Sequence, residues 1–265
     1  MMARVTAKSA VSTTALKALR VVEAVAAKPG LSTLGEIALR AGLDKSAAHR
    51  MLATLVVAGY VNQDEASRRY GLSYHVVSLS RNLLANNEVS RLTRAALERL
   101  ANDTGESIDV SILDGHETVV IQRVEGSQLV GVDFSVGDRS PLYCTSIGKA
   151  VLTWQPEAFI DEVLKGPLKR HASHTIVDPG ALRAELEVIG RRGYAIDDHE
   201  LSDHMRCIAA PIFERDARVR MGISISGPDN RFTLEYLDSL RPALLAATEG
   251  LTVQLGGVPH APETV

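Results

Sequence analysis

The sequence predicts an α+β protein of two domains: an N-terminal winged helix-turn-helix and a C-terminal domain built on an antiparallel sheet. Residues 31–72 carry helix caps, a short turn and a hairpin pattern in the order of a winged helix-turn-helix. Farther along the chain, neighbouring hairpin patterns with helices at the ends of the series are typical of an antiparallel α+β sheet. With 265 residues and 45% hydrophobic content, the chain can bury a core in each domain.

We expect boundaries where the periodic patterns stop and Gly, Pro or Asn interrupts them. The first ten residues, MMARVTAKSA, are small, polar and basic and show no periodicity, which is typical of a disordered arm. The expected segments are a flexible arm over 1–11, the winged helix-turn-helix over 12–72, a linker helix over 73–89, a second domain over 90–256 and a flexible tail over 257–265.

The first two helices are predicted from apolar spacing and from capping residues. The first runs over 12–28 and stops at Pro29-Gly30, and its apolar face is expected to hold Leu16, Leu19, Val22 and Ala26. Thr33 and Glu36 fit a capping box, so the second helix begins near Leu34. Gly42 can adopt the left-handed conformation that ends it.

The third helix is the candidate recognition helix, with Asp44 as its N-cap. An apolar stripe at helical spacing comprises Ala48, Met51, Leu52, Leu55 and Val56. The opposite side carries Lys45, Ser46, His49, Arg50 and Thr54. A short solvated helix can show the same polar residues by chance. The capped helix before it and the hairpin after it favour DNA recognition.

The hairpin after this helix is expected to be a wing. Residues 59–61 and 69–72 are short strand patterns around the polar turn 63–67, and Arg68 and Arg69 lie where a wing meets the DNA backbone or minor groove. An ordinary surface hairpin with two solvated arginines is the alternative. The predicted DNA-binding residues are Thr33, Lys45, Ser46, His49, Arg50, Arg68 and Arg69.

Charge is divided unevenly along the chain. Residues 1–80 hold ten Lys or Arg against five Asp or Glu, whereas residues 81–265 hold nineteen against twenty-seven. The whole-chain charge of −3 therefore hides a basic front and an acidic remainder. Nucleic acid is expected to contact the front alone, because phosphate is repelled by acidic surfaces.

The linker helix and the second domain follow. The linker carries Val76, Val77, Leu79, Leu83 and Leu84, which is more apolar surface than an isolated linker needs. In the second domain the expected helices are 90–102, 145–154, 179–192 and 233–254, and the expected strands are 107–113, 119–124, 129–134, 194–196, 207–213 and 218–226.

Several function classes are disfavoured by the sequence. A run of eighteen apolar residues and a secretory leader are both missing, so the expected location is cytoplasmic. Cys144 and Cys207 are isolated and are expected to be reduced thiols. The stretch from Asp197 to His204 has enough donors for a divalent metal, but a polar acidic loop is the commoner meaning. We therefore expect no metal, no cofactor and no catalytic residue.

The motifs resemble those of the IclR family of bacterial transcriptional regulators. They are LDKSAAHRMLATLVVAGYV in the winged helix, CTSIGKAVL at 144–152, RRGYAIDD at 191–198, and RCIAAPIF with GISISGP within 206–228. The resemblance implies a winged helix-turn-helix, a linker helix, a GAF-like effector-binding domain over 90–256, and homodimers or dimers of dimers on operator DNA. Ala47 and Ala48 stand where many relatives have Ser-Thr.

A pocket for a small organic acid, a keto acid or an aromatic acid, is also implied by the resemblance. Ser224 and Ser226 lie on one face of a predicted strand, because side chains alternate with a period of two. Ordinary polarity at a sheet rim is the alternative for these serines. Carried over by motif, the effector-binding residues are Ser146, Ile147, Asp197, Cys207, Ser224 and Ser226. Asp197 can face an anion only if it is protonated, turned toward a ligand hydroxyl or bridged by water.

Two functions of different class remain open. The first is a one-component, ligand-responsive transcriptional regulator, with repression favoured because a ligand-released repressor needs fewer contacts. The second is a metabolite-processing thiol or metal enzyme with a nucleic-acid-tethering domain. A thiol enzyme needs an activated thiolate and a nearby base, and the local sequence provides no such base.

Overall fold

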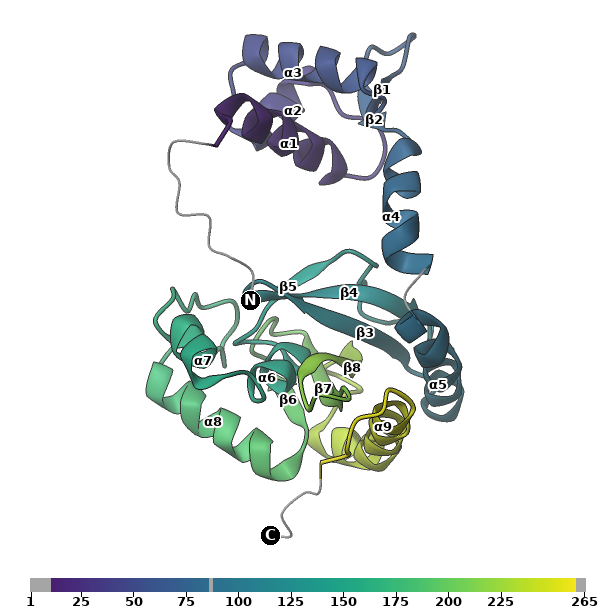
Figure 1. Ribbon diagram of the computed structural model, residues 1–265, viewed down its shortest axis with the longest axis vertical. Coiled ribbons are helices and arrows are strands. Elements are labelled where there is room, and N and C mark those ends of the chain that lie inside the picture. Colours follow the sequence, from purple (N-terminus) through teal and green to yellow (C-terminus); the bar gives the residue numbers. More distant parts are fainter. Residues whose placement is uncertain (1–10, 86–87, 261–265) are drawn as a thin grey trace. The chain divides into compact units, whose positions relative to one another are not determined.

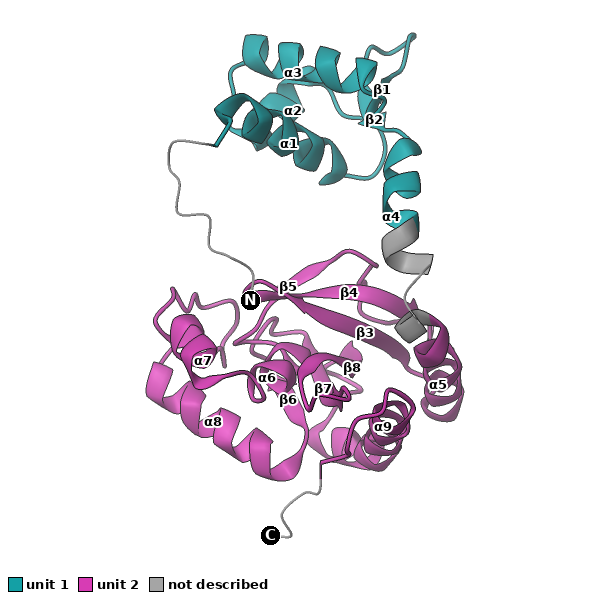
Figure 2. Cartoon of the chain, viewed as in Figure 1, with its two compact units in different colours: residues 1–86 teal, residues 87–265 magenta. Residues whose placement is uncertain are grey.

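The computed structural model describes residues 11–85 and 88–260, and it describes side chains outside 82–90 (Figure 1). The expected arm, apart from Val11, and the last five residues of the expected tail lie outside the described residues. So do Asn86 and Asn87, where we expected the linker to end. The chain forms two compact units, residues 1–86 (unit 1) and 87–265 (unit 2), shown in Figure 2.

Unit 1 has the predicted order of elements. It consists of α1 (Thr13–Ala26), α2 (Leu34–Ala41), α3 (Lys45–Val57), β1 (Val61–Gln63), β2 (Tyr70–Leu72) and α4 (His75–Ala85). Strands β1 and β2 pair antiparallel, and Ser32 forms a further bridge to Tyr70. The helices pack around a core that includes Val21, Ile37 and Leu52.

The predicted caps of unit 1 are confirmed. Thr33 and Glu36 form both halves of the capping box, and Gly42 ends α2 with φ of 64°. The side chain of Asp44 accepts a hydrogen bond of 2.8 Å from the amide of Ala47, which starts α3. The three or so residues between the helices are therefore fixed by local interactions.

Two predicted apolar faces differ from the structure. In α1 the buried residues are Val21, Ala24 and Val25, whereas Leu16 and Leu19 are 44% and 57% exposed. In α3 the buried stripe contains Ala47 in addition to Ala48, Leu52 and Leu55, and Val56 is 38% exposed. Helices α1, α2 and α3 contact one another, so the residues on those contacting faces are buried and the other apolar residues of α1 and α3 stay exposed.

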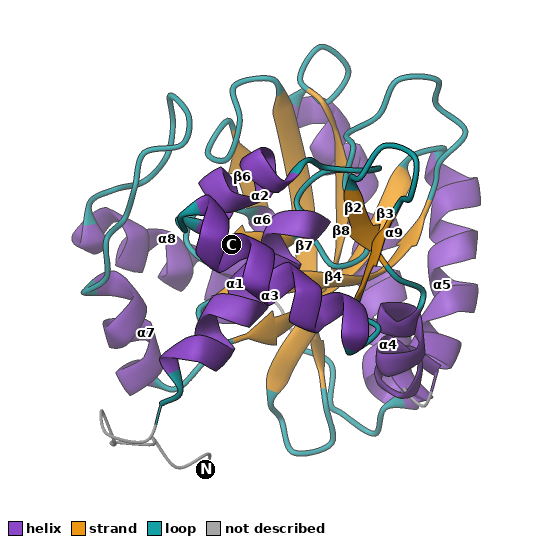
Figure 3. Ribbon diagram, turned by 90° about the horizontal axis from the view of Figure 1, so that it is seen from above, coloured by secondary structure: helices purple, strands orange, loops and turns teal. Residues whose placement is uncertain are grey.

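Unit 2 is a six-stranded antiparallel sheet covered by helices on both faces. The elements are α5 (Glu88–Thr104), β3 (Ser107–Asp114), β4 (Glu117–Val124), β5 (Arg139–Pro141), α6 (Ser146–Leu152), α7 (Glu157–Leu164), α8 (Pro179–Arg192), β6 (Ala195–Asp198), β7 (Met205–Phe213), β8 (Val219–Pro228) and α9 (Leu234–Gln254). The strand order is β5-β4-β3-β8-β7-β6. Helices α5 and α9 cover one face and α6, α7 and α8 the other, as Figure 3 shows.

Four features of unit 2 differ from the sequence-based expectation. Helix α7 and strand β5 were not predicted, and the predicted strand 129–134 is a loop. Its backbone is held by side chains instead of a neighbouring strand: Arg123 donates to the carbonyl of Val132 at 2.7 Å, and Arg231 to that of Val130 at 3.1 Å. Residues 257–260, expected within the flexible tail, include His260, whose ring contacts Trp154. Among the described residues, no helix is long and apolar enough to cross a membrane.

Candidate functional site

The predicted DNA-contacting side chains of α3 lie on one exposed side of the helix. Lys45, Ser46, His49 and Arg50 are exposed, while the neighbouring Ala47 and Ala48 are buried in the core. Arg50 donates to Ser46 Oγ at 3.2 Å, one turn away. Because Ala47 and Ala48 face the core, their side chains cannot contact bases.

Thr33 is largely occupied by its role as a helix cap. Its amide and its hydroxyl donate to the Glu36 carboxylate at 2.7 and 2.8 Å, and its Oγ1 accepts from the Glu36 amide at 3.3 Å. These hydrogen bonds, with the nearby Lys28, lower the pKa of Glu36 to about 2. Thr33 is half-buried, so it places α2 and adds less exposed surface than the α3 residues.

The wing presents Arg68 and Arg69 to solvent. Its turn is closed by Asp64, which accepts from the amide and the hydroxyl of Ser67 at 2.7 and 2.5 Å. Arg68 has a φ of 56°, a left-handed conformation, and is exposed. Within the described part of the chain, Lys45, Arg68 and Arg69 form no ion pair, so their charges are available to phosphate.

The six predicted effector-binding residues all line one pocket of unit 2. They come from the start of α6 and from strands β6, β7 and β8. The sheet register explains the gathering: Asp197 is opposite Cys207, which is opposite Ser226, while Ser224 is opposite Asp109 of β3 in the next row. These side chains share a face because every second residue of a strand points the same way. The structure thus brings together residues that lie as much as 80 positions apart in the sequence, from Ser146 to Ser226.

Two glycines allow α6 to approach this face of the sheet. A Cβ at Gly222 would lie 2.5 Å from the carbonyl oxygen of Ala210 and 2.7 Å from Ile147 Cδ1. A Cβ at Gly148 would lie 2.6 Å from the backbone of Leu142. Thr145 caps α6 by accepting from the Gly148 amide at 3.0 Å. The first residues of α6, Ser146 and Ile147, therefore form a wall of the pocket.

Asp197 is placed to interact with a ligand by one oxygen. Its Oδ1 accepts from the Glu200 amide at 2.7 Å, whereas its Oδ2 is buried and has no hydrogen-bond partner in the described part of the chain. Burial raises the pKa of Asp197 to about 7, with the charge of Glu200 adding to the effect and the Glu200 amide and Lys149 opposing it. The side chain is therefore partly protonated near neutral pH and can donate or accept.

The structure adds pocket residues that the sequence did not indicate. Asp109 lines the pocket, and both of its carboxylate oxygens accept from Arg123 Nη1, at 2.8 and 2.9 Å. Burial raises the pKa of Asp109 to about 6 against the opposing effect of Arg123. Phe134, from the loop that Arg123 holds, lines the pocket as well. These residues escaped prediction because the register of β3 and the path of this loop are set by tertiary contacts.

Lys149 of α6 is buried and pairs with the buried Glu200, and it lies 3.8 Å from Glu185. Glu200 in turn supplies the amide that binds Asp197. The lysine of the SIGKAVL segment therefore does not reach the ligand pocket, whose lining residues exclude it. It positions the loop after β6, which contains Glu200.

Both thiols are poorly suited to nucleophilic chemistry. Burial raises the pKa of Cys144 to about 12 and that of Cys207 well above its usual range. A thiol with a raised pKa remains protonated at neutral pH and is a weak nucleophile. The geometry therefore gives no support to the thiol-enzyme alternative.

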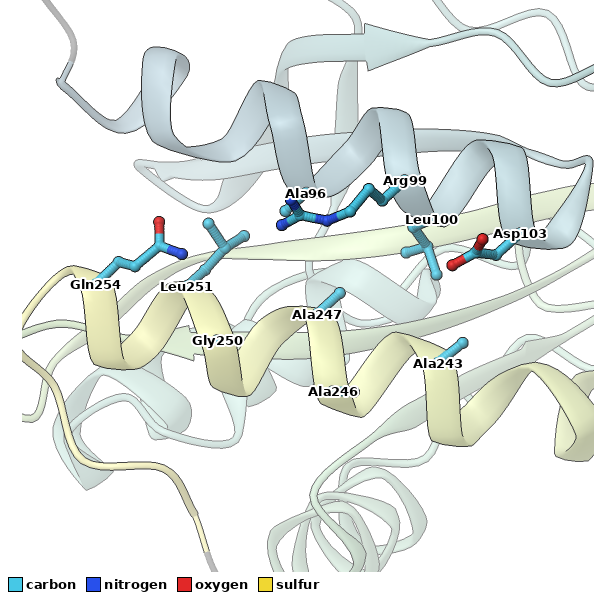
Figure 4. Close-up of a pocket in the computed structure, with 10 residues that line it drawn as sticks. All are labelled: Ala96, Arg99, Leu100, Asp103, Ala243, Ala246, Ala247, Gly250, Leu251 and Gln254. Carbon is cyan, nitrogen blue, oxygen red and sulfur yellow. The ribbon is translucent and has the colours of Figure 1, made fainter.

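A larger groove lies between α5 and α9 and gathers none of the predicted residues. It has a volume of about 250 Å³ and is lined by small residues of α9, by Leu100 and Leu251, and by the polar side chains of Arg99, Asp103 and Gln254 (Figure 4). The polar groups lie along the rim and do not converge on one point. We therefore place the candidate ligand site in the smaller pocket beside α6.

A winged helix-turn-helix with an exposed basic face, joined to a domain with a buried polar pocket, defines a ligand-responsive, DNA-binding transcriptional regulator. Residues 14–65 match the IclR helix-turn-helix domain, and residues 81–253 match the bacterial transcriptional regulator IclR C-terminal domain. The chain belongs to the IclR family.

Individual relatives agree with this assignment. The transcriptional repressor IclR of Escherichia coli is 29% identical over 246 residues, which cover 91% of this chain and 89% of the repressor. The crystal structure of the Thermotoga maritima IclR is similar with a TM-score of 0.73, 30% identity and coverage of 92% and 98%. An IclR homologue from Microbacterium hydrocarbonoxydans, crystallised with 4-hydroxybenzoate, shares the fold with a TM-score of 0.74, 24% identity and coverage of 91% and 100%.

Proposed function

We propose that this chain is a repressor whose affinity for operator DNA is lowered by a small organic acid bound in unit 2. The carrying observation is that Ser146, Ile147, Asp197, Cys207, Ser224 and Ser226, from four separate elements, line one buried pocket in a chain that also has a DNA-reading unit. The absence of an activated thiol supports a regulator over an enzyme.

The lining of the pocket favours an acid that is held by hydrogen bonds. None of the fourteen lining residues is Lys, Arg or His, while six are Ser or Thr. A carboxylate in this pocket is therefore stabilised by hydrogen bonds from hydroxyl groups, from the amides at the start of α6, and from Asp197 when it retains its proton near pH 7. Asp197 in its charged form would instead accept from a hydroxyl of the ligand.

The pocket must widen for a ligand to enter. Its volume is about 30 Å³, which is enough for one or two water molecules and too small for a keto acid or an aromatic acid. The sheet and α6 are closely packed walls, whereas Phe134 belongs to a loop held at the backbone by Arg123. We infer that this loop moves when the effector binds.

On DNA, Lys45, Ser46, His49 and Arg50 are proposed to enter the major groove, and Arg68 and Arg69 to contact the backbone or the minor groove. Thr33 is proposed to contact phosphate at the start of α2, beside the cap that it forms. An operator with two-fold symmetry follows if two chains bind side by side, because a dimer places its recognition helices on two half-sites.

A second copy of the chain is the proposed partner of α4. Tyr74, just before α4, is 89% exposed, and Val77 and Leu79 are 62% and 52% exposed, so this apolar surface is not used within unit 1. Val76 is half-buried. Leu83 and Leu84, expected in the same contact, have side chains outside the described residues. Contact between linker helices would set the spacing of the two recognition helices.

The DNA side of the proposal is tested by selecting binding sites from a random DNA library with the full-length chain. We expect an inverted repeat whose half-sites are separated by about one helical turn or a multiple of it. Failure to enrich any sequence over a library selected without protein would refute sequence-specific binding.

The effector side is tested on the selected operator with pyruvate and 4-hydroxybenzoate as probes of the two acid classes. We expect one class to raise the melting temperature of the chain and to release it from DNA, because binding to the native state adds stability. Reciprocity requires that the same acid bind the DNA-loaded chain more weakly. Conversion of either acid to a product, without any change in DNA affinity, would favour the enzyme alternative.

A further inference from the structure

A second group of polar side chains converges at the edge strand β6, outside the ligand pocket. His174 comes from the loop between α7 and α8, and Asp198 and His199 lie at the end of β6 and just after it. One potential ligand atom from each residue lies within 4.8 Å of the other two. Asp198 follows Asp197 on the strand, so its side chain points to the opposite side from the ligand pocket.

The spacing of these side chains suits a shared cation. His174 Nδ1 lies 3.6 Å from Asp198 Oδ2, and His199 Nδ1 lies 3.5 Å from Asp198 Oδ1. Both separations exceed an ordinary N–H···O hydrogen bond. Neighbouring ligand atoms of a tetrahedral ion with bonds of about 2.1 Å stand roughly 3.4 Å apart, which is close to the separation of His199 Nδ1 from Asp198 Oδ1.

The second nitrogen of His199 also lacks a hydrogen bond. His199 Nε2 is buried without a partner in the described part of the chain, and the nearest acidic atom is Asp229 Oδ2 at 3.9 Å. A buried ring nitrogen is rarely left unpaired. A histidine that binds a metal by one nitrogen commonly turns the other toward a carboxylate, so Asp229 is placed to orient His199.

Hydrogen bonds between the two loops hold this group in place. The His174 amide donates to the carbonyl of His199 at 3.1 Å, and the Ser173 amide donates to Asp203 Oδ1 at 2.8 Å. His174 Nδ1 also donates to the carbonyl oxygen of Asp198 at 3.0 Å, which keeps the ring beside the carboxylate and leaves Nε2 as the nitrogen that can bind an ion. The side chains are therefore positioned before any ion binds, which lowers the cost of forming a site.

The carboxylate of Asp198 is oriented by Arg206, which donates to its Oδ1 at 2.5 Å. The guanidinium of Arg206 also places a positive charge near the site. This charge disfavours ions that bind mainly by charge attraction to oxygen, so the affinity for an ion depends on the imidazole nitrogens.

We propose that His174, Asp198 and His199 form a binding site for a divalent transition-metal ion of the Zn²⁺ class. Two imidazoles and one carboxylate are a donor set for Zn²⁺, Ni²⁺ or Cu²⁺, whereas Mg²⁺ and Ca²⁺ prefer oxygen ligands. The site is separate from the ligand pocket, so it does not depend on the identity of the effector. The sequence alone favoured a polar acidic loop, which is the commoner meaning of such a stretch, and His174 joins the group only in the fold, from 24 residues away.

The test uses the full-length chain without an affinity tag, stripped with a chelator and dialysed. Zn²⁺ is titrated in competition with a chromogenic chelator, and Co²⁺ serves as a spectroscopic probe of tetrahedral geometry. We expect one equivalent of ion per chain, no competition from excess Mg²⁺, and a loss of affinity on the order of a hundredfold or more for His174→Ala and His199→Ala.

The matched controls are His171→Ala and His204→Ala, which remove histidines near the same loops that lie outside the cluster. They are expected to bind Zn²⁺ as the unmodified chain does. Melting curves recorded in the presence of chelator show whether each variant is folded. If a histidine variant does not fold, Asp198→Asn, which keeps the size of the side chain, is used in its place. Binding of less than one equivalent, affinity unchanged in the cluster variants, or equal loss in the controls would overturn the proposal.

Discussion

The residues proposed to contact DNA and those that line the ligand pocket are built into the chain in opposite ways. The former lie within residues 33–69, and all but the half-buried Thr33 are exposed on helix or wing surfaces. The pocket residues come from segments between 109 and 226, and most of them are buried. Exposed side chains without fixed partners contribute to binding and little to stability. Buried polar side chains contribute to both, so substitutions should affect the two regions differently.

The largest effect is expected at Lys149, which is buried and paired with Glu200. Replacing it as Lys149→Met leaves the buried carboxylate without its cation, which typically costs about 3–5 kcal/mol of unfolding free energy. Urea unfolding followed by the fluorescence of Trp154, the single tryptophan, measures unit 2 specifically. The matched control is Lys165→Met, because Lys165 is 78% exposed in a surface ion pair with Asp161. Equal stability of the two variants would show that the buried pair is not needed.

The pH dependence of stability should identify Asp197. Its pKa is about 7 in the folded chain against an ordinary value of 3.8, so folding favours the protonated form. The associated stability is lost as pH rises from about 4 to 7, and between pH 5 and pH 8 the loss amounts to at most roughly 3 kcal/mol. Asp197→Asn does not titrate and keeps the Oδ1 acceptor. We expect the unfolding free energy of this variant, relative to that of the unmodified chain, to increase between pH 5 and pH 8.

Asp216→Asn is the control for this measurement, because the hydrogen bond from Arg218 holds the pKa of Asp216 below its ordinary value and the group stays ionised over the whole range. Its stability relative to the unmodified chain should be the same at both pH values. A constant difference for Asp197→Asn as well would mean that Asp197 is ionised in the folded chain, and the proton assigned to it in effector binding would have to come from elsewhere.

Loss of a pocket serine should weaken binding of the effector without changing the affinity of the ligand-free chain for DNA. Ser224→Ala and Ser226→Ala each remove a hydroxyl donor, and a hydrogen bond to a charged ligand is worth on the order of 1.5–3 kcal/mol, or roughly ten- to a hundredfold in Kd. Calorimetry with the acid that releases the operator gives the affinity. Ser239→Ala, on the exposed surface of α9, is the control. Unchanged affinity in both pocket variants would place the effector elsewhere.

The contrast between residues close together in the sequence and residues brought together by the fold explains how far the sequence could predict the fold and the sites. The capping box at Thr33, the αL end at Gly42 and the cap at Asp44 depend on residues three or four positions apart, and all three were predicted correctly. The exposed Leu16 and Leu19 were predicted to be buried, because periodicity does not say which face of α1 meets α2 and α3.

Long-range partners were beyond prediction from the residues alone. The loop 129–134 has the composition of a strand, but the edge of β4 is paired with β5, and arginines hold the loop backbone instead. The Asp109–Arg123 pair depends on the register between β3 and β4. The serines of β8 could be placed on a common face by alternation, whereas their meeting with Asp197 and Ser146 was indicated only by the family motifs.

The smallest effects are expected on the DNA-binding face. Arg50→Ala and Lys45→Ala remove exposed charges that support no buried contact, so the unfolding free energy should change by less than about 0.5 kcal/mol. Operator affinity should nevertheless fall, and a residue that contacts phosphate should lower the dependence of log Kd on log salt by about one unit of slope. A residue that reads a base should instead relax specificity at one position of the operator. Binding measured across a salt series separates the two roles, and Lys17→Ala on α1 serves as a charge-matched control. If Arg50→Ala and Lys45→Ala bind as tightly as the control at every salt concentration, α3 is not the recognition helix, and the division between a surface that binds and a pocket that also stabilises does not hold for this chain.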